Sequence, residues 1–148
     1  MQSWRDTLSV AAVADIDRML DTCLRLARER LLTASEFEPF AVVTALDGRL
    51  LAVDLDTTAL GKHPETDELA DATAARLRTL AEEVRGTALT LNTRLSRERT
   101  DAIEVRIEHR EGVAVIVLMT YRRPRFGGLI EYDEPRAFPG EREVWPAI

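Results

Sequence analysis

The sequence predicts an α+β protein in which helices pack against a five-stranded, mainly antiparallel sheet. Two long segments carry apolar residues at helical spacing, which predicts two helices. An Asp-Gly hairpin and a later segment of alternating apolar and polar residues are typical of antiparallel strands. The order is helix, hairpin, helix and three strands, followed by a tail rich in proline and glycine that we expect to be irregular.

Length and charge limit the classes of function. With 148 residues we expect a single domain, with a helical region at 1–34, a core of sheet and helix at 35–121 and the tail at 122–148. A net charge of -6 argues against nucleic acid or an anionic membrane as the main partner, because phosphate binding requires a basic surface. The start MQSWRDTLSV has no signal-peptide pattern, and no apolar run approaches the roughly 20 residues that cross a bilayer, so we expect a cytoplasmic protein.

The first helical region extends from Ser3 to about Ala34, as one helix or as two with a bend. Ser3 and Asp6 have the spacing of a helix-capping pair. The lone cysteine, Cys23, is predicted to be an inert core thiol, because it lies on the apolar stripe of this region. This stripe predicts the face that packs on the sheet and comprises Ile16, Met19, Leu20, Cys23, Leu24, Ala27 and Leu31.

The next segment predicts a hairpin and a second helix. Residues 40–46 and 49–55 are apolar strands that flank Asp47-Gly48, a pair that favours tight turns. After a polar linker, the second helix is expected at 64–85, and Gly86 is expected to end it. Its apolar face comprises Leu69, Ala72, Thr73, Leu77, Leu80 and Val84.

Three strands are predicted in the second half, at 87–95, 103–110 and 113–119. The middle strand alternates apolar residues with a charged row, so one face is buried and the other is either solvated or receives a partner. The last strand is apolar on both faces, so we expect it to be central, with 40–46 as its second neighbour. In the tail, 127–134 is a candidate extra strand and Trp145 a candidate docking residue. The charged row comprises Glu104, Arg106, Glu108 and Arg110.

Residues 35–121 resemble the roadblock / dynein light chain family, which has a profilin-like sheet. The resemblance is carried by an apolar strand, an Asp-Gly turn, a second apolar strand and an alanine-rich helix, in the segment FAVVTALDGRLLAVDLDTTALGKHPETDELADATAARLRTLAEEV. In that family the last strand sits at the centre beside the first. The long N-terminal region, the long linker and the tail in place of a final helix depart from the family pattern. The resemblance implies a homodimeric, non-catalytic scaffold or regulatory module that binds proteins such as small GTPases.

The segment AVDLDTT places Asp54, Asp56 and Thr58 in a DxDxT pattern after an apolar strand. The pattern resembles the first motif of haloacid dehalogenase-type phosphatases. This implies a nucleophilic Asp54, an acid/base Asp56 and Mg²⁺ held by both. That family requires a parallel sheet and a later lysine, whereas this strand is predicted to belong to a hairpin and Lys62 is too close in sequence. The simpler interpretation is a strand end capped by polar residues.

The two histidines indicate structure rather than chemistry. His63 precedes the second helix in a loop, and His109 lies on the apolar face of its strand, where a packed, hydrogen-bonded side chain is expected. Two histidines and one cysteine do not form a zinc pattern. The segment RFGGL lacks the strand-loop-helix context of a phosphate-binding loop. We therefore expect no cofactor and no metal site.

The segment YRRPRF is the strongest candidate for a binding site. Tyr121, Arg122, Arg123, Arg125 and Phe126 combine aromatic and arginine side chains, which are enriched at protein interfaces. The simpler interpretation is an ordinary exposed strand end. If the segment is a binding site, replacing its three arginines with alanine leaves folding intact and weakens partner binding.

These observations leave three functions open. The leading hypothesis is a non-catalytic protein-interaction or regulatory module, homodimeric and without a cofactor, because no coherent catalytic set is found. An alternative is a small acidic binder of immunity or chaperone type, since an acidic surface attracts a basic partner. The third is a Mg²⁺-dependent phosphatase that uses Asp54, Asp56 and Thr58.

Overall fold

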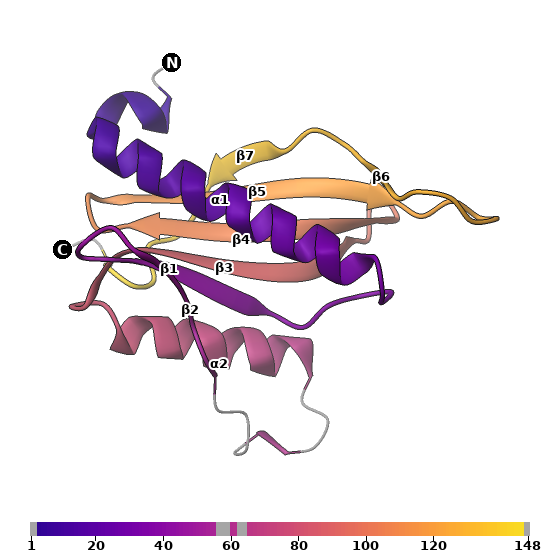
Figure 1. Cartoon of the computed structure of the whole chain (residues 1–148), viewed down its shortest axis with the longest axis horizontal. Helices are drawn as coiled ribbons and strands as arrows, with labels where there is room; N and C mark the ends of the chain where they lie inside the picture. The colour runs from indigo at the N-terminus through magenta and orange to yellow at the C-terminus, as the bar shows by residue number, and fades with distance from the viewer. Residues whose placement is uncertain (1–2, 56–59, 62–64, 147–148) are drawn as a thin grey trace.

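A computed structural model describes residues 3–55, 60–61 and 65–146. In this part of the chain, two long helices pack against a strongly curled antiparallel half-barrel of seven strands, which confirms the α+β prediction (Figure 1). The strand order is β2-β1-β3-β4-β5-β6, with β7 also paired to β5. None of the helices in these ranges is long and apolar enough to cross a bilayer.

The N-terminal region forms two helices, a short 3-10 helix at Trp4–Thr7 and α1 at Val10–Leu31. The predicted capping pair is present, since Ser3 Oγ accepts from the backbone of Arg5 and Asp6 accepts from the Ser3 N–H. Ser9 then caps α1 by accepting a hydrogen bond from Ala12 N at 3.1 Å. Of the two alternatives left open by the sequence, the bent pair of helices is the correct one.

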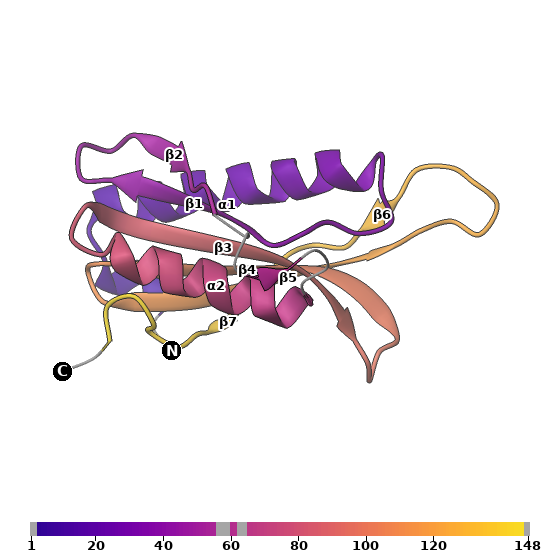
Figure 2. The ribbon, with the colours of Figure 1, turned by 90° about the horizontal axis from the view of Figure 1, so that it is seen from below.

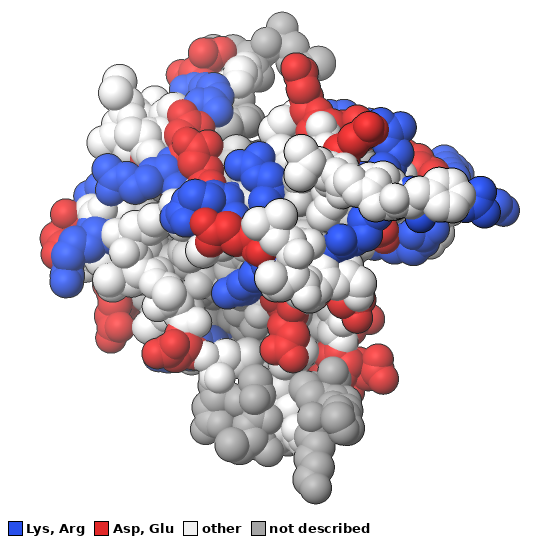
Figure 3. Space-filling view, turned by 45° about the vertical axis from the view of Figure 1, so that its right-hand side comes forward, with Lys and Arg blue, Asp and Glu red and all other residues white. Residues whose placement is uncertain are grey.

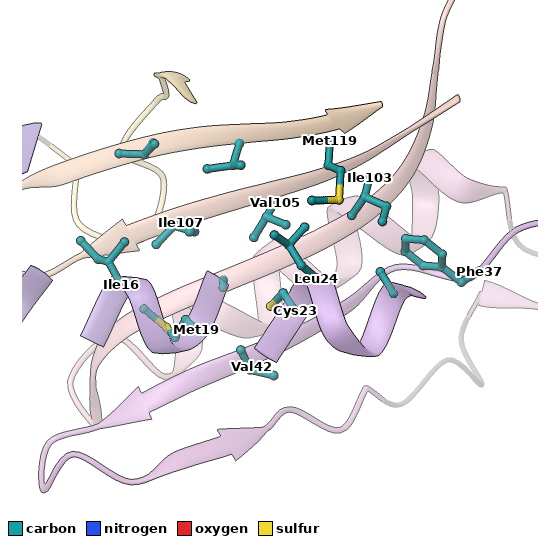
Figure 4. Close-up of a cluster of buried hydrophobic side chains, with 14 of the residues drawn as sticks. Ile16, Met19, Cys23, Leu24, Phe37, Val42, Ile103, Val105, Ile107 and Met119 are labelled. Carbon is teal, nitrogen blue, oxygen red and sulfur yellow. The ribbon is translucent and has the colours of Figure 1, made fainter. Parts of the chain in front are cut away.

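The apolar stripe of α1 packs across one face of the sheet (Figure 4). Met19 and Cys23 are fully buried there, against Val42 of β1 and Val105 of β4. The close approach of helix to sheet depends on Gly86, because a Cβ atom at this position would lie 2.7 Å from the methyl carbon of Met19. This face holds a continuous core of interdigitated side chains.

The first hairpin is confirmed. β1 (Phe40–Ala45) pairs antiparallel with β2 (Leu50–Ala52), and Gly48 in the turn has a φ of +92°. β2 is shorter than expected from the sequence, since its pairing ends at Ala52.

The second helix is shorter than expected, and Gly86 does not end it. α2 spans Thr66–Thr79, and β3 spans Val84–Leu95 and includes Gly86. Backbone turns connect them, with Leu80 N donating to Leu77 O and Glu83 N donating to Leu80 O. Helical periodicity continues through Val84 in the sequence, but pairing with Ala45 of β1 places that residue in the sheet.

The last strands correct the predicted topology. β4 is Thr100–His109 and β5 is Val113–Arg122, but β5 lies beside β6 (Glu131–Tyr132) and β7 (Arg136–Pro139), not beside β1. The second neighbour of β1 is β3. The tail, expected to be irregular, thus supplies two strands that cover the edge of β5. The candidate strand at 127–134 includes β6, whereas β7 was not predicted. This order differs from the one that the roadblock resemblance implies, so the topology gives that resemblance no support.

The charged row of β4 is only partly solvated. Arg106 and Arg110 are exposed, but Glu108 has only 5% of its surface exposed. The C-terminal segment lies on this side of the sheet beside α2 (Figure 2), and its backbone N–H groups donate to the carboxylate of Glu108. Trp145 docks as expected, donating from its ring nitrogen to Ala81 O at 3.1 Å.

Candidate protein-interaction surface

Between β5 and β6 the chain leaves the sheet as a protruding arm, residues 123–130 (Figures 1 and 2). The tip turns at Gly127 and Gly128, whose φ angles of +87° and +114° are readily adopted only by glycine. The base of the arm is fixed by Asp133. Its N–H donates to Thr120 O at 2.9 Å, and its carboxylate accepts from Thr120 Oγ1 at 2.6 Å. The arm therefore extends from a well-anchored base.

Tyr121, the first of the five predicted site residues, belongs to the core instead. Its side chain is 1% exposed, and its hydroxyl accepts a hydrogen bond from Asn92 Nδ2 at 2.8 Å. Its ring packs against Tyr132 of β6 with centroids 5.8 Å apart. Burial raises the pKa of the Tyr121 hydroxyl. The residue therefore cannot contact a partner in this conformation.

The two arginines that follow have intramolecular partners. Arg122 lies near the carboxylates of Glu131 and Asp133, at 3.6 and 3.7 Å. Arg123 donates through Nη2 to the carbonyl oxygens of Leu31 and Ala34, at 3.1 and 2.6 Å. The Leu31 carbonyl ends α1, where a cation also suits the helix dipole, and the Ala34 carbonyl lies in the loop that follows. Arg123 thus ties the arm to α1, and its role is structural.

Arg125 and Phe126 are the predicted residues that remain available. Phe126 is 95% exposed. Arg125 is exposed and makes no hydrogen bond or ion pair with any residue that the structure describes. Two exposed leucines were not predicted from the sequence, Leu129 in the arm (84% exposed) and Leu32 just after α1 (74% exposed).

A hollow of about 320 Å³ separates the arm from the C-terminal half of α1. Ile130 and Tyr132 line it on the arm side, and Arg25, Arg28 and Glu29 border it from α1, where Arg25 lies 3.3 Å from the carboxylate of Glu29. Figure 3 brings this side of the molecule forward and shows arginine side chains beside uncharged surface. We call this region the arm surface, which comprises Arg25, Arg28, Leu32, Arg125, Phe126 and Leu129.

The sequence contained a weak signal for these additional residues. Leu32 is an apolar residue that lies outside the buried stripe of α1, and Leu129 is apolar but follows two turn-forming glycines. Such positions indicate exposure. Nothing in the sequence indicated that both would border the same hollow, because the packing of the arm against α1 brings them together.

A second cluster of charged side chains lies at the other end of α1 and is buried. Asp15, 4% exposed, accepts hydrogen bonds from Arg85 at 2.8 and 2.9 Å, and its Oδ2 lies 3.0 Å from His109 Nε2. His109 Nδ1 accepts from Glu111 N at 3.2 Å, so Nε2 carries the proton and donates to Asp15. Burial would raise the pKa of Asp15, but these hydrogen bonds outweigh it and hold the pKa below its usual range. The sequence signal was an acidic residue within the apolar stripe.

The Asp15 cluster has the composition of a catalytic dyad but not the geometry. Both ring nitrogens of His109 are occupied, and the ring is 3% exposed, so it has no free nitrogen for proton transfer to a substrate. The expectation that His109 is packed and hydrogen-bonded is confirmed. Cys23 is likewise buried, and burial raises the pKa of its thiol to about 11, which leaves it un-ionised at neutral pH.

The DxDxT segment lies mostly outside the described residues. Asp54 follows β2 and is exposed, whereas Asp56, Thr58, Lys62 and His63 are not described. β2 pairs antiparallel with β1, as predicted. Among the described residues, no group of three or more histidine, cysteine, aspartate or glutamate side chains is placed to hold a metal ion.

Comparison with protein-family models, with curated proteins and with solved structures finds no match for this chain.

Proposed function

We propose that this protein is a non-catalytic protein-binding module whose partner docks on the arm surface. The observation that carries the proposal is the exposure of Phe126 and Leu129 on an arm with an anchored base, where Leu129 borders a hollow that arginines also line. Single exposed apolar residues are common, but a group of them around a hollow is typical of a recognition surface.

The chemistry of the arm surface specifies the partner. Exposed apolar side chains contribute about 25 cal/mol for each Å² that docking removes from water. Arg25 is paired with Glu29, but Arg28 and Arg125 form no ion pair with a described residue and can bind carboxylates through paired hydrogen bonds, which orients the partner. The partner is therefore a protein segment that carries a large apolar side chain next to aspartate or glutamate. The concave shape of the hollow favours an inserted side chain over a flat bilayer.

The test is a selection of random displayed peptides on the wild-type protein, counter-selected on Phe126→Ser/Leu129→Ser. We expect enriched peptides to combine an aromatic or large aliphatic residue with acidic residues. Their binding should be lost in the arm double variant and weakened by Arg125→Glu. Val10→Ser is a matched control, because Val10 is 89% exposed at the opposite end of α1, and Arg78→Glu controls for charge.

Two results would contradict the proposal. Peptides that bind the arm double variant as well as the wild type would place the site elsewhere. Basic peptides whose binding depends on Asp67 and Asp71 of α2 would instead support the acidic-binder alternative, since these carboxylates border a second hollow, on the α2 side of the sheet.

The proposed homodimer is tested by light scattering over a range of protein concentrations. If the second copy docks through the arm surface, Phe126→Ser/Leu129→Ser lowers the dimer fraction and Val10→Ser does not. A wild-type protein that stays monomeric at high concentration removes self-association from the proposal and leaves a different protein as the partner.

The non-catalytic part of the proposal is tested separately. A generic phosphate ester with Mg²⁺ should not be hydrolysed above background. Hydrolysis that is abolished by Asp54→Asn would overturn this part in favour of the phosphatase.

A further inference from the structure

A cavity of about 400 Å³ lies on the sheet face opposite α1, between α2, strands β3 to β5 and the C-terminal segment. Leu77 of α2, Leu89 of β3 and Ile116 of β5 supply apolar walls, and Ala74 and Ala114 leave room between them. Small-molecule sites are commonly apolar clefts of about 300 to 1,000 Å³ with a few polar groups. This cavity has that size and that character.

The outer wall of the cavity is a C-terminal strap, residues 139–145, which is bound to the body. The carboxylate of Glu108 accepts hydrogen bonds from three consecutive backbone N–H groups, of Glu143, Val144 and Trp145, at 2.7, 3.0 and 2.5 Å. At the other end of the strap, Gly140 N donates to Ala114 O at 3.0 Å. Because the strap is held on both sides, the cavity is a formed site and not a gap under a loose tail.

The charges on the lining are predominantly acidic. Glu141 and Glu143 lie on the strap and are exposed to solvent. Glu108 is already engaged by the strap. Arg106, the only cation on the cavity lining among the described residues, is paired with Glu104 at 2.6 Å. Glu141 and Glu143 form no ion pair with a described residue, and Arg142 between them does not line the cavity, so the two carboxylates favour a positively charged group there over a negative one.

We propose that this cavity binds a small organic amine with an apolar body. The body packs between Leu77, Leu89 and Ile116, and the ammonium group lies at the rim near Glu141 and Glu143. The cavity is separate from the arm surface, because the arm surface includes the end of α1 and the cavity lies on the sheet face opposite α1. The strap closes one side of the site, so its position is coupled to occupancy.

Trp145 provides the readout, because its backbone N–H donates to the carboxylate of Glu108, which lines the cavity. The chain has two tryptophans, so Trp4→Phe leaves Trp145 as the only one. In this background, fluorescence is titrated with octylamine, octanol and octanoate, which share an apolar body and differ in charge. We expect a saturable change with octylamine, weaker binding of octanol and the weakest binding of octanoate. Equal binding of octanoate and octylamine would overturn the proposal.

Two variants locate the site. Ala114→Phe fills the cavity and should abolish the octylamine response. Glu141→Gln/Glu143→Gln keeps the backbone N–H that binds Glu108, and it should weaken octylamine binding on the order of fivefold while leaving octanol binding unchanged. Glu36→Gln/Glu38→Gln is the matched control, since both glutamates are exposed in the loop after α1. If Ala114→Phe fails to fold, Glu141→Gln/Glu143→Gln still tests the proposal, because it changes only exposed side chains. Unchanged octylamine binding in that double variant would contradict the proposal.

Discussion

The Asp15 cluster and the arm surface lie at opposite ends of α1, and both contain arginine next to other charged or aromatic groups. In the Asp15 cluster, the carboxylate of Asp15 satisfies both Arg85 and His109, and little of it reaches solvent. On the arm surface, Phe126 is almost fully exposed and Arg125 makes no hydrogen bond or ion pair with a described residue. The two regions have similar residue types. They differ in that the charged groups of the Asp15 cluster are hydrogen-bonded within the protein, whereas Arg125 on the arm surface is not.

This difference assigns different roles to the two regions. A buried charge that has found its partners stabilises one arrangement of helix and sheet, and breaking it leaves an uncompensated charge. Exposed apolar and cationic groups contribute little to folding, so their presence is better explained by binding. Substitutions in the first region should therefore change stability, and substitutions in the second should change binding alone.

The largest expected effect is that of Asp15→Asn. Asparagine offers one acceptor oxygen where the carboxylate of Asp15 offers two, so Arg85 and His109 lose hydrogen bonds and the free energy of unfolding should fall by about 3 kcal/mol at neutral pH. Asp17→Asn on the same helix is the control, because the ion pair of Asp17 with Arg5 is exposed and worth at most about 1 kcal/mol. Denaturant unfolding measures both. Equal effects for the two variants would remove the distinction between the regions.

The effect of Asp15 should depend on pH in one direction. The pKa of Asp15 is lower in the folded protein than its ordinary value, so the folded state binds fewer protons there. Its stabilising contribution is then present above the unfolded pKa and is lost as pH falls through the folded pKa. The stability difference between wild type and Asp15→Asn should therefore shrink at acidic pH. A difference that grows on acidification would show that the sign is wrong.

A smaller effect is expected from a comparison of two arginines within the arm. Arg123→Ala removes one hydrogen bond to the end of α1 and one to the loop that follows it, and should destabilise the protein by about 1 kcal/mol. Arg125→Ala should leave stability unchanged. Thermal unfolding of the two single variants tests this. The sequence led us to expect that alanine at all three arginines leaves folding intact, whereas the hydrogen bonds of Arg123 now predict a loss of stability. A destabilised Arg125→Ala would show that the arm is held by contacts beyond Arg123.

The smallest expected effect on stability is that of Phe126→Ser/Leu129→Ser. Both side chains are already exposed in the folded state, so the free energy of unfolding should change by less than about 0.5 kcal/mol. Denaturant unfolding of this variant beside Val10→Ser measures it. A loss comparable to that of Arg123→Ala would mean that the arm packs on the body in solution and is not free to bind.

Local patterns in the sequence predicted much of the fold. Helical spacing located α1 and its buried stripe, the Asp-Gly pair located the first hairpin, and alternation located β4 with His109 on its buried face. These features depend on neighbours within a few residues. Of the predicted binding segment, Arg125 and Phe126 are exposed and Tyr121 is buried, and local sequence could not indicate this burial because it depends on contacts with Asn92 and Tyr132.

The sequence by itself thus determined the elements, the apolar faces and an arginine-aromatic segment after the last long strand. Only the tertiary structure decided the strand order, the two strands of the tail, the burial of Glu108 under the strap and the pairing of Asp15 with Arg85 and His109. The physical reason is the range of the interactions. Periodicity records which face of an element is apolar, whereas each of these contacts joins residues far apart in the chain that meet only when the sheet curls and its edges are covered.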